Sequence, residues 1–260
     1  MLITLTTDFG YQDHFVGVMK GVILSINPHA QIVDLTHGIP RQNIMAAALL
    51  LQCAAPYFPP GTIHAVVVDP EVGSSRHPLL IEFEGSYFLG PDNGVLTLAL
   101  EAKRPTRVIR LSNTRYQLQP TSATFHGRDI FAPAAGHLSL GIAVHAFGEP
   151  TDKWVQLRWP KIIKAGAAIM GEILHIDTFG NLFTNIRADD LKEVPPDKLK
   201  IKLGNVSIHG LVQNYATAGR ADCIALINSW GVLEIAVYKE SAQKRAGARI
   251  GDKVEVAADS

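Results

Sequence analysis

Residues 2–35, LITLTTDFGYQDHFVGVMKGVILSINPHAQIVDL, decide the fold class. The apolar and β-branched residues from Leu2 to Leu5 predict a strand. From Asp13 onward, apolar side chains recur at helical spacing until Asn27-Pro28 stops the pattern, and Gln31–Leu35 again has the composition of a strand. A strand, a helix and a second strand in this order predict a parallel α/β sheet.

The same alternation continues along the chain. Ile44–Ala55 is rich in Ala and Leu and predicts a helix, and Thr62–Val68 is a short apolar run that ends at Asp69. Ligands of parallel sheets bind beyond the carboxyl ends of the strands, and Asp8, Asp34 and Asp69 all fall at strand ends in this interpretation. Three carboxylates at one edge of a sheet are the first indication of a functional site.

The sequence changes character after Pro150, where an irregular polar and aromatic bridge leads into shorter, glycine-punctuated segments. We therefore expect an α/β N-terminal domain with a mainly parallel sheet, residues 1–155, and a small all-β barrel C-terminal domain, residues 156–260. The predicted strands of the second domain are Ala167–Asp177, Leu199–Leu203, Val206–Leu211, Cys223–Asn228, Val232–Val237 and Lys253–Val256.

The composition excludes several classes of protein. The 260 residues are 47% hydrophobic and 18% charged, which excludes disorder as the main state. Lys+Arg and Asp+Glu are 24 each, so no broad basic field attracts a nucleic acid or an anionic membrane. The two cysteines, Cys53 and Cys223, form no CxxC pair, and we expect a reducing, cytoplasmic location.

The sequence carries no pattern of a targeting or membrane segment. The N-terminus lacks a positively charged region and reaches Asp8 after a few apolar residues, unlike a secretory signal. The longest apolar stretch, Ile44–Tyr57, is interrupted by Gln52 and falls short of the roughly 20 residues that a membrane span needs. We expect no transmembrane helix.

The motif TTDFG, Thr6–Gly10, places a carboxylate at the end of the first strand. Asp8 can accept two hydrogen bonds from a ribose diol, and Gly10 lets the chain turn closely around a ligand. The alternative is that Asp8 only closes a turn. Asp13, at the predicted helix start, is more typical of a helix cap.

Two further motifs carry groups suited to catalysis. In VVVDPEVGSSR, Asp69 and Arg76 can meet as a bidentate ion pair, whose role is either functional or purely structural. In TFHGRD, His126 lies on a tight turn before a predicted helix, where backbone N–H groups favour an anion. The 10 histidines include no pair with H-x-H or H-x-x-x-H spacing, and we expect no metal site.

The second domain contributes HIDTFGNLFTNI, His175–Ile186, and INSWG, Ile227–Gly231. Each motif combines Asn or Ser with a glycine turn and nearby aromatic rings, a combination that suits a pocket for a zwitterion and a flat base. The alternative is two ordinary β-turns. The sequence has no GxGxxG after a strand, no P-loop and no GxSxG elbow, so redox and kinase functions are not indicated.

Taken together and in this order, these motifs resemble one family. LTTDFG, DLTH, FPPGT, VVDPEVGSSR, GPDNGVL, TFHGRDIFAPAA, DTFGNLFTNI and INSWGVLEIA are similar to segments of the S-adenosyl-L-methionine hydroxide adenosyltransferases, whose relatives are the adenosyl fluorinases and chlorinases. The resemblance extends from Leu2 to Val256. It implies an α/β domain followed by a β-barrel domain, and a homotrimer whose active sites lie between one subunit's N-terminal domain and its neighbour's C-terminal domain.

The implied reaction is S-adenosyl-L-methionine plus water giving adenosine and L-methionine, with no cofactor. By resemblance, three residues prepare the water and Asp8 holds the ribose hydroxyls; the three are Asp69, Arg76 and His126. In the second domain the positions that hold the methionine part and flank the adenine are Asp177, Phe179, Asn181 and Ser229. We also expect four residues of the same motifs to line the substrate site: Phe9, Asp13, Phe125 and Trp230.

Water is favoured over halide as the nucleophile. The fluorinases carry an extra loop after the segment that matches Val66–Gly73, and the serine that helps to hold fluoride corresponds here to Gly127. Glu71 departs from the family, which often has glycine there, and puts the tuning of Asp69 in question. The alternatives are an adenosyl halogenase that uses chloride, a non-catalytic S-adenosyl-L-methionine-binding module, or a phosphoesterase with Mg²⁺ held by Asp8, Asp34 and Asp69.

Overall fold

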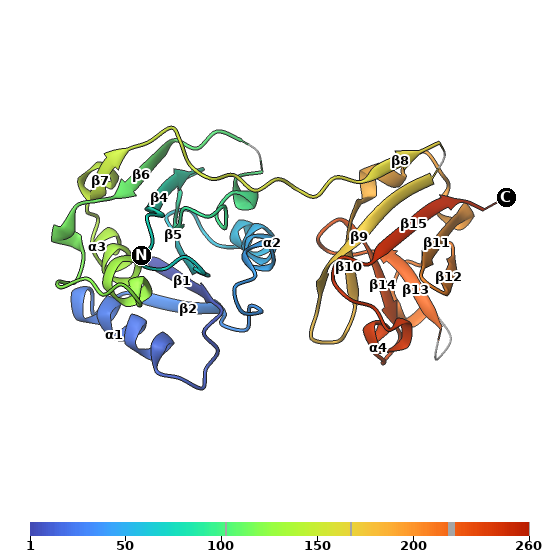
Figure 1. The fold of residues 1–260 in the computed structure, drawn as a ribbon, viewed down its shortest axis with the longest axis horizontal. Helices are drawn as coiled ribbons and strands as arrows, with labels where there is room; N and C mark the ends of the chain where they lie inside the picture. Colours follow the sequence, from blue (N-terminus) through green and yellow to red (C-terminus); the bar gives the residue numbers. More distant parts are fainter. Residues whose placement is uncertain (102, 167, 218–221, 260) are drawn as a thin grey trace. The chain divides into compact units, whose positions relative to one another are not determined.

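The computed structural model describes residues 1–101, 103–166, 168–217 and 222–259. The chain divides into two compact units, Met1–Arg158 and Trp159–Ser260, which are described separately below. Figure 1 shows the elements of both units along the chain.

The N-terminal unit is built on a seven-stranded sheet with the order β2-β1-β3-β5-β4-β6-β7. Its strands are β1 (Leu2–Thr7), β2 (Gln31–Thr36), β3 (Ile63–Val67), β4 (Pro78–Phe83), β5 (Ser86–Pro91), β6 (Arg107–Leu111) and β7 (Gly148–Pro150). The strands β2, β1, β3 and β5 are parallel, as predicted for this domain, whereas β4, β6 and β7 pair antiparallel, so the sheet is mixed. The cause is a tight hairpin: Glu84 and Gly85 both have positive φ, 45° and 77°, and reverse the chain between β4 and β5.

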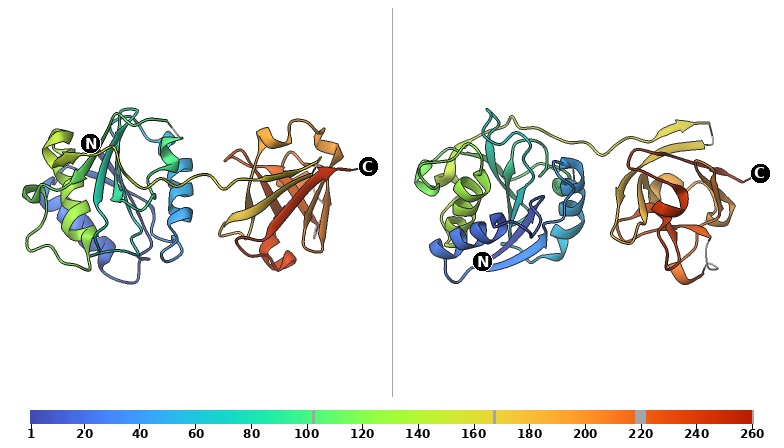
Figure 2. Two further views of the ribbon diagram at one scale, coloured as in Figure 1. Left: turned by 45° about the horizontal axis from the view of Figure 1, so that its top comes forward. Right: turned by 60° about the horizontal axis from the view of Figure 1, so that its bottom comes forward.

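Helices cover both faces of this sheet, as Figures 1 and 2 show. They are α1 (Phe15–Ile26), α2 (Ile44–Ala54) and α3 (Ala132–Ser139). One core packs α1 and α3 against β1, and the other packs α2 against the opposite face. Every residue of β3 is buried: Val67 points into the first core and Val66 into the second, which also contains Val68, the residue after the strand. This two-sided burial is why the strand is a continuous apolar run.

The starts of the first two helices differ in their caps. Helix α2 begins as predicted, and Asn43 Oδ1 accepts a hydrogen bond from the backbone N–H of Ala46 at 2.9 Å. At α1 the N-cap position is His14, which makes no side-chain capping bond. The prediction that Asp13 caps this helix is therefore wrong, because α1 begins at Phe15 and Asp13 lies one residue before the N-cap position.

The C-terminal unit is a strongly curved sheet with the order β12-β11-β15-β9-β10-β14-β13, with β8 beside β9. Its strands are β8 (Ile163–Ala165), β9 (Ala168–Ile176), β10 (Leu182–Arg187), β11 (Leu199–Leu203), β12 (Val206–His209), β13 (Cys223–Ile227), β14 (Val232–Val237) and β15 (Lys253–Ala258). Ala167, the first residue of a predicted strand, lies outside the described residues.

The sheet nearly closes on itself, because the backbone N–H of Val212, after β12, donates to the carbonyl of Ala225 in β13 at 2.9 Å. Inward-facing side chains from β9, β10, β11, β14 and β15 form its core. The unit also contains a short helix, α4 (Ala242–Ala246), between β14 and β15, so the barrel is not entirely β. Within the described ranges, no helix combines the length and the apolar character that a membrane crossing requires.

Candidate active site

The loop between β3 and β4 holds a buried ion pair. Arg76 Nε donates to Asp69 Oδ1 at 2.9 Å, and Arg76 Nη2 donates to Asp69 Oδ2. The two side chains are only 4% and 5% exposed. The bidentate geometry that their spacing predicts is therefore present, and because the pair is buried, loss of either partner would leave the other charge without a counter-ion.

His126 belongs to the same cluster. Its Nδ1 lies 2.5 Å from Arg76 Nη2. A guanidinium can only donate hydrogen bonds, so Nδ1 is the acceptor and the neutral ring carries its proton on Nε2. Burial and the Arg76 charge lower the pKa of His126 below its ordinary value of 6.5, which favours this neutral form.

Two local features bring these residues together. Gly73 has a φ of 81°, and a Cβ there would lie 2.2 Å from the carbonyl oxygen of Ala123, so only glycine allows the two loops to touch. His126 directly precedes a π-helical turn, Gly127–Phe131, a distortion that often occurs at functional sites. The ring of Phe131 in this turn lies 5.8 Å from the Arg76 guanidinium.

The end of β1 approaches the His126 turn. The Phe9 and Phe125 ring centroids are 5.9 Å apart, and Phe15 of α1 lies 5.1 Å from Phe125. Next to Phe9, Asp8 accepts a hydrogen bond from the backbone N–H of Gln42 through Oδ2 at 2.8 Å. The TTDFG turn and the His126 turn are thus joined by a small aromatic cluster, so the structure brings these two predicted site segments together.

Two predicted carboxylates lie apart from this cluster. Asp34 is inside β2, not beyond it, and binds Lys20 Nζ at 2.6 Å. Asp13 is exposed ahead of α1. Among the described residues, no group of three or more His, Cys, Asp or Glu side chains is arranged to hold a metal ion. The carboxylate cluster that the phosphoesterase hypothesis requires from Asp8, Asp34 and Asp69 is therefore not assembled.

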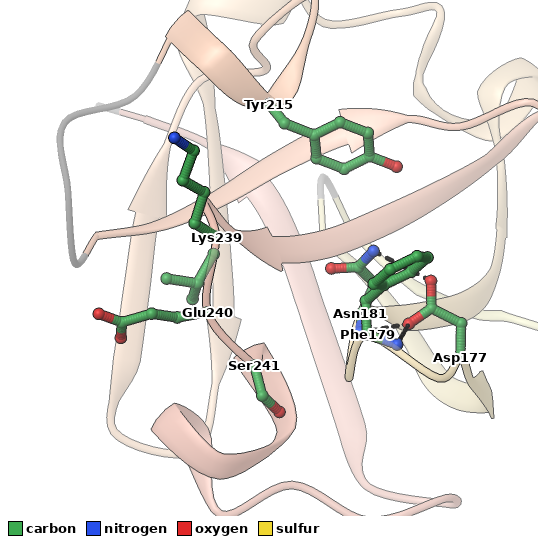
Figure 3. Close-up of a pocket in the computed structure, with 8 residues that line it drawn as sticks. Asp177, Phe179, Asn181, Tyr215, Lys239, Glu240 and Ser241 are labelled. Atoms are coloured by element: carbon green, nitrogen blue, oxygen red, sulfur yellow. Dashed lines mark hydrogen bonds between the residues drawn. The ribbon is translucent and has the colours of Figure 1, made fainter.

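The C-terminal unit has a pocket of about 530 Å³, shown in Figure 3, a volume typical of small-molecule sites. Asp177 lies at its side and shapes the turn that follows β9: Oδ1 accepts from the backbone N–H groups of Phe179 and Asn181 at 2.9 and 2.8 Å, and Oδ2 accepts from Asn181 Nδ2 at 3.0 Å. The lining residues are Asp177, Phe179, Asn181, Tyr215, Val237, Lys239, Glu240 and Ser241.

The pocket contains some of the predicted residues and not others. Asp177, Phe179 and Asn181 line it, and Phe179 is 77% exposed. Ser229 and Trp230 are not among its described lining residues. The Trp230 ring instead stacks on His175, with ring centroids 5.4 Å apart. The INSWG residues Ser229 and Trp230 are therefore outside the described lining of this pocket, and Trp230 packs on His175 of β9.

Several lining residues escaped the sequence analysis, among them Tyr215, Lys239 and Ser241. Behind Tyr215 lies Glu234, which is fully buried and accepts hydrogen bonds from Tyr215 Oη at 2.9 Å and from Asn228 Nδ2 at 3.0 Å. Burial, and secondarily the nearby charge of Asp177, raises the pKa of Glu234. An acidic residue in the middle of the strand pattern VLEIAV was the available signal for this network.

Comparison with known proteins gives consistent matches over both units. Residues 3–148 match the family model of the SAM hydroxide adenosyltransferase N-terminal domain, and residues 171–255 match that of the C-terminal domain. A solved structure of an uncharacterized conserved protein from Thermotoga maritima has a TM-score of 0.91 and 35% identity, covering 99% of this chain and 100% of that one.

The similarity to curated relatives covers nearly the whole chain. A protein of Methanocaldococcus jannaschii named (R)-S-adenosyl-L-methionine hydrolase is 36% identical over 98% of this chain and 95% of its own length. A protein of the same name from Thermus thermophilus is 34% identical over 96% and 97%. A fluorinase from Actinoplanes is 29% identical over 90% of each chain. With both family domains matched in order, the chain belongs to the S-adenosyl-L-methionine hydroxide adenosyltransferase family.

Proposed function

We propose that this protein cleaves S-adenosyl-L-methionine with water to give adenosine and L-methionine. The observation that carries the proposal is the buried cluster of Asp69, Arg76 and His126 in a chain that belongs to this family. The relatives named as hydrolases specify the (R) configuration of the substrate, and we extend the proposal to the (R) epimer of the sulfonium.

The chemistry places its main demand on the nucleophile. The sulfonium makes C5′ electrophilic and departs as the neutral thioether of methionine, so the leaving group needs no proton. Bulk water, with a pKa of about 15.7, is a poor nucleophile and needs assistance from the protein. The water oxygen forms the new bond to C5′, the C5′–S bond breaks with its electron pair staying on sulfur, and the water gives up one proton.

The geometry of the cluster supports different roles for its three side chains when the water loses its proton. His126 Nδ1 is occupied by Arg76, so the imidazole presents its Nε2–H group to a bound water. Asp69 has lone pairs beyond those that Arg76 occupies and accepts a hydrogen bond from the same water. We propose that Asp69 accepts the released proton while His126 Nε2–H holds the water oxygen, and that Arg76 orients both side chains.

The remaining predicted residues hold the substrate in this proposal. Asp8 binds the ribose diol and aligns C5′ for in-line attack. The methionine part and the adenine are held by residues of the second unit, and the aromatic cluster of Phe9 and Phe125 borders the reacting carbon. The residues assigned to the second unit are Asp177, Phe179, Asn181, Ser229 and Trp230. Asp13 is exposed ahead of α1, and its place in the substrate site stays a prediction.

The proposed function also implies an oligomeric state and a cellular location. We propose a homotrimer in which the N-terminal domain, residues 1–155, of one subunit and the C-terminal domain, residues 156–260, of a neighbour complete each site. The reaction as written needs no cofactor. Both cysteines, Cys53 and Cys223, are free thiols, which supports a reducing, cytoplasmic location.

Halide transfer is the second candidate, because curated fluorinases are among the relatives. Identity to the fluorinase is lower than to the hydrolases, 29% against 36% and 34%. At Gly127 a Cβ would lie 3.1 Å from Met19 Sδ and from Phe125 Cε2, so the serine of the halide site fits here only if these neighbours shift. These observations favour water.

Product analysis tests the proposal. Pure protein is incubated with S-adenosyl-L-methionine, as separated (R) and (S) epimers, with and without excess chloride or fluoride, and the products are separated by chromatography. We expect adenosine and methionine in equal amounts, from the (R) epimer first. A 5′-halo-5′-deoxyadenosine would establish the halogenase instead, and bound but intact substrate would establish a binding module.

A further inference from the structure

A chain of polar contacts lies beneath the TTDFG turn. The hydroxyl oxygen of Thr7, the residue before Asp8, is 2.8 Å from His37 Nδ1, and both side chains are buried. The same oxygen accepts a hydrogen bond from the backbone N–H of Phe9 at 3.2 Å. The backbone N–H of Gly10 donates to the carbonyl of His37 at 2.8 Å. His37 therefore contacts the turn on both sides of Asp8.

The ring of His37 is itself fixed from behind. Its Nε2 lies 3.1 Å from Asp34 Oδ1, close enough for attraction although the two atoms form no hydrogen bond. Asp34 Oδ2 accepts from Lys20 Nζ at 2.6 Å and from Tyr11 Oη at 3.1 Å. The imidazole therefore lies between the Thr7 hydroxyl on one side and the Asp34 carboxylate on the other. Asp34 lies in β2, directly beside β1, as Figure 1 shows. Two adjacent parallel strands thus hold the imidazole in one orientation.

The segment that begins with His37 also reaches Asp8 directly. Gln42 donates its backbone N–H to Asp8 Oδ2 at 2.8 Å. Gln42 is one of the few non-glycine residues with a positive φ, 61°, a conformation that costs free energy and persists only when its surroundings hold it. The segment 37–42 therefore grips the turn at Thr7, Gly10 and Asp8.

We propose that Thr7 and His37 are positioning residues that fix the Asp8 carboxylate for recognition of the ribose diol. This inference rests on the proposed function, in which Asp8 binds the ribose. Neither side chain needs to touch the substrate. A carboxylate that is already aligned binds the two hydroxyls with little loss of conformational freedom. A turn that is free to shift loses more conformational freedom when it binds them.

The test measures discrimination between two nucleosides by calorimetry: adenosine, and 2′,3′-dideoxyadenosine, which lacks both ribose hydroxyls. For the native protein we expect adenosine to bind about 10- to 100-fold more tightly, the effect of hydrogen bonds to a charged group. In Thr7→Val and His37→Gln the ratio falls to about threefold or less, and in Thr7→Ser it recovers. With S-adenosyl-L-methionine, Thr7→Val raises KM more than it lowers kcat.

The chain offers a matched control. Thr4 on the same strand makes an equivalent buried bond, 2.8 Å from its hydroxyl to His64 Nδ1, away from the Asp8 turn. Thr4→Val lowers thermal stability as Thr7→Val does and keeps the native nucleoside ratio. A native ratio in Thr7→Val and in His37→Gln would overturn the inference while leaving the proposed function intact. A native protein that neither binds adenosine nor forms it would overturn both.

Discussion

At the scale of single residues, Arg76 is the centre of the catalytic cluster. Its planar fork contacts both oxygens of Asp69 and Nδ1 of His126. A lysine has one ammonium on a flexible stem and cannot reproduce three directed contacts. We expect Arg76→Lys to lower kcat about 100-fold or more, the loss typical of disturbed acid–base catalysis.

The control for Arg76→Lys is Arg107→Lys. Arg107 is 54% exposed and its nearest carboxylate, on Glu82, is 3.6 Å away. This surface ion pair contributes little to stability, so the kcat and KM of Arg107→Lys for S-adenosyl-L-methionine should match those of the native enzyme. A native kcat in Arg76→Lys would show that the fork is structural only.

The protonation of His126 predicts the pH dependence. Burial, and then the Arg76 charge, lowers the pKa of His126 below 6.5, so the ring is neutral at pH 7. Protonation places a second cation beside Arg76 and removes the Nδ1 acceptor, so activity falls as the pH falls through this lowered pKa. The acid limb of kcat/KM should lie below pH 6.5 and be absent in His126→Gln. An acid limb above pH 6.5 would contradict this assignment.

Some contacts of the site residues could be predicted from the sequence and others could not. Asp69 and Arg76 could be paired because they lie on one short glycine-containing loop. His126 joins them only through the contact between two loops, which no local spacing encodes. Asp34 was placed at a strand end, but β2 continues to Thr36, so the carboxylate faces Lys20 instead. The hydrogen bond from Gln42 to Asp8 uses the backbone and leaves no trace in residue type.

At the scale of elements, the approach of two loops depends on Gly73. Both Gly73 and Gly61 have positive φ, 81° and 85°, but only at Gly73 would a Cβ meet backbone, 2.2 Å from the Ala123 carbonyl oxygen. Alanine at Gly61 costs about 1–2 kcal/mol of strain and nothing else. Gly73→Ala should cost more stability and, by displacing Arg76 from His126, most of the activity.

Thermal melts and kinetics of the two alanine variants check this prediction. Gly61→Ala should lose stability and retain native kcat. If Gly73→Ala shows the same modest destabilisation and native kcat, the loop contact does not position the cluster.

Elements with strong periodicity were predictable and short distorted ones were not. The helix from Ile44 and the strand before Asp69 have the expected bounds to within a residue or two. The sequence does not predict strand β10 (Leu182–Arg187), because Gly180 and Asn181 directly before it favour a turn. The π-helical turn Gly127–Phe131 has no periodic signature, and the sequence did not predict the hairpin at Glu84-Gly85, which makes β4 antiparallel to β5.

In the whole molecule, the proposed trimer requires that each site combines residues of two subunits. Asp69→Asn disables the N-terminal half of a site and Asp177→Asn the C-terminal half. If the two inactive proteins are mixed, unfolded together and refolded, about a quarter of the sites in random trimers combine two intact halves. We expect activity to return to that fraction of the native value.

Native mass spectrometry of the mixture verifies that mixed trimers have formed. Each variant refolded alone is the control and should stay inactive. If mixed trimers form without recovery of activity, both halves of a site come from one subunit, and the assembly proposal fails.

Isotope labelling shows whether water attacks C5′ of S-adenosyl-L-methionine. The reaction is run in H₂¹⁸O and the adenosine is analysed by mass spectrometry, with Asp69→Asn as the control. We predict adenosine with one ¹⁸O atom in its 5′-hydroxyl, formed far faster than with the control. Unlabelled adenosine, or no adenosine beyond the control rate, would contradict the account.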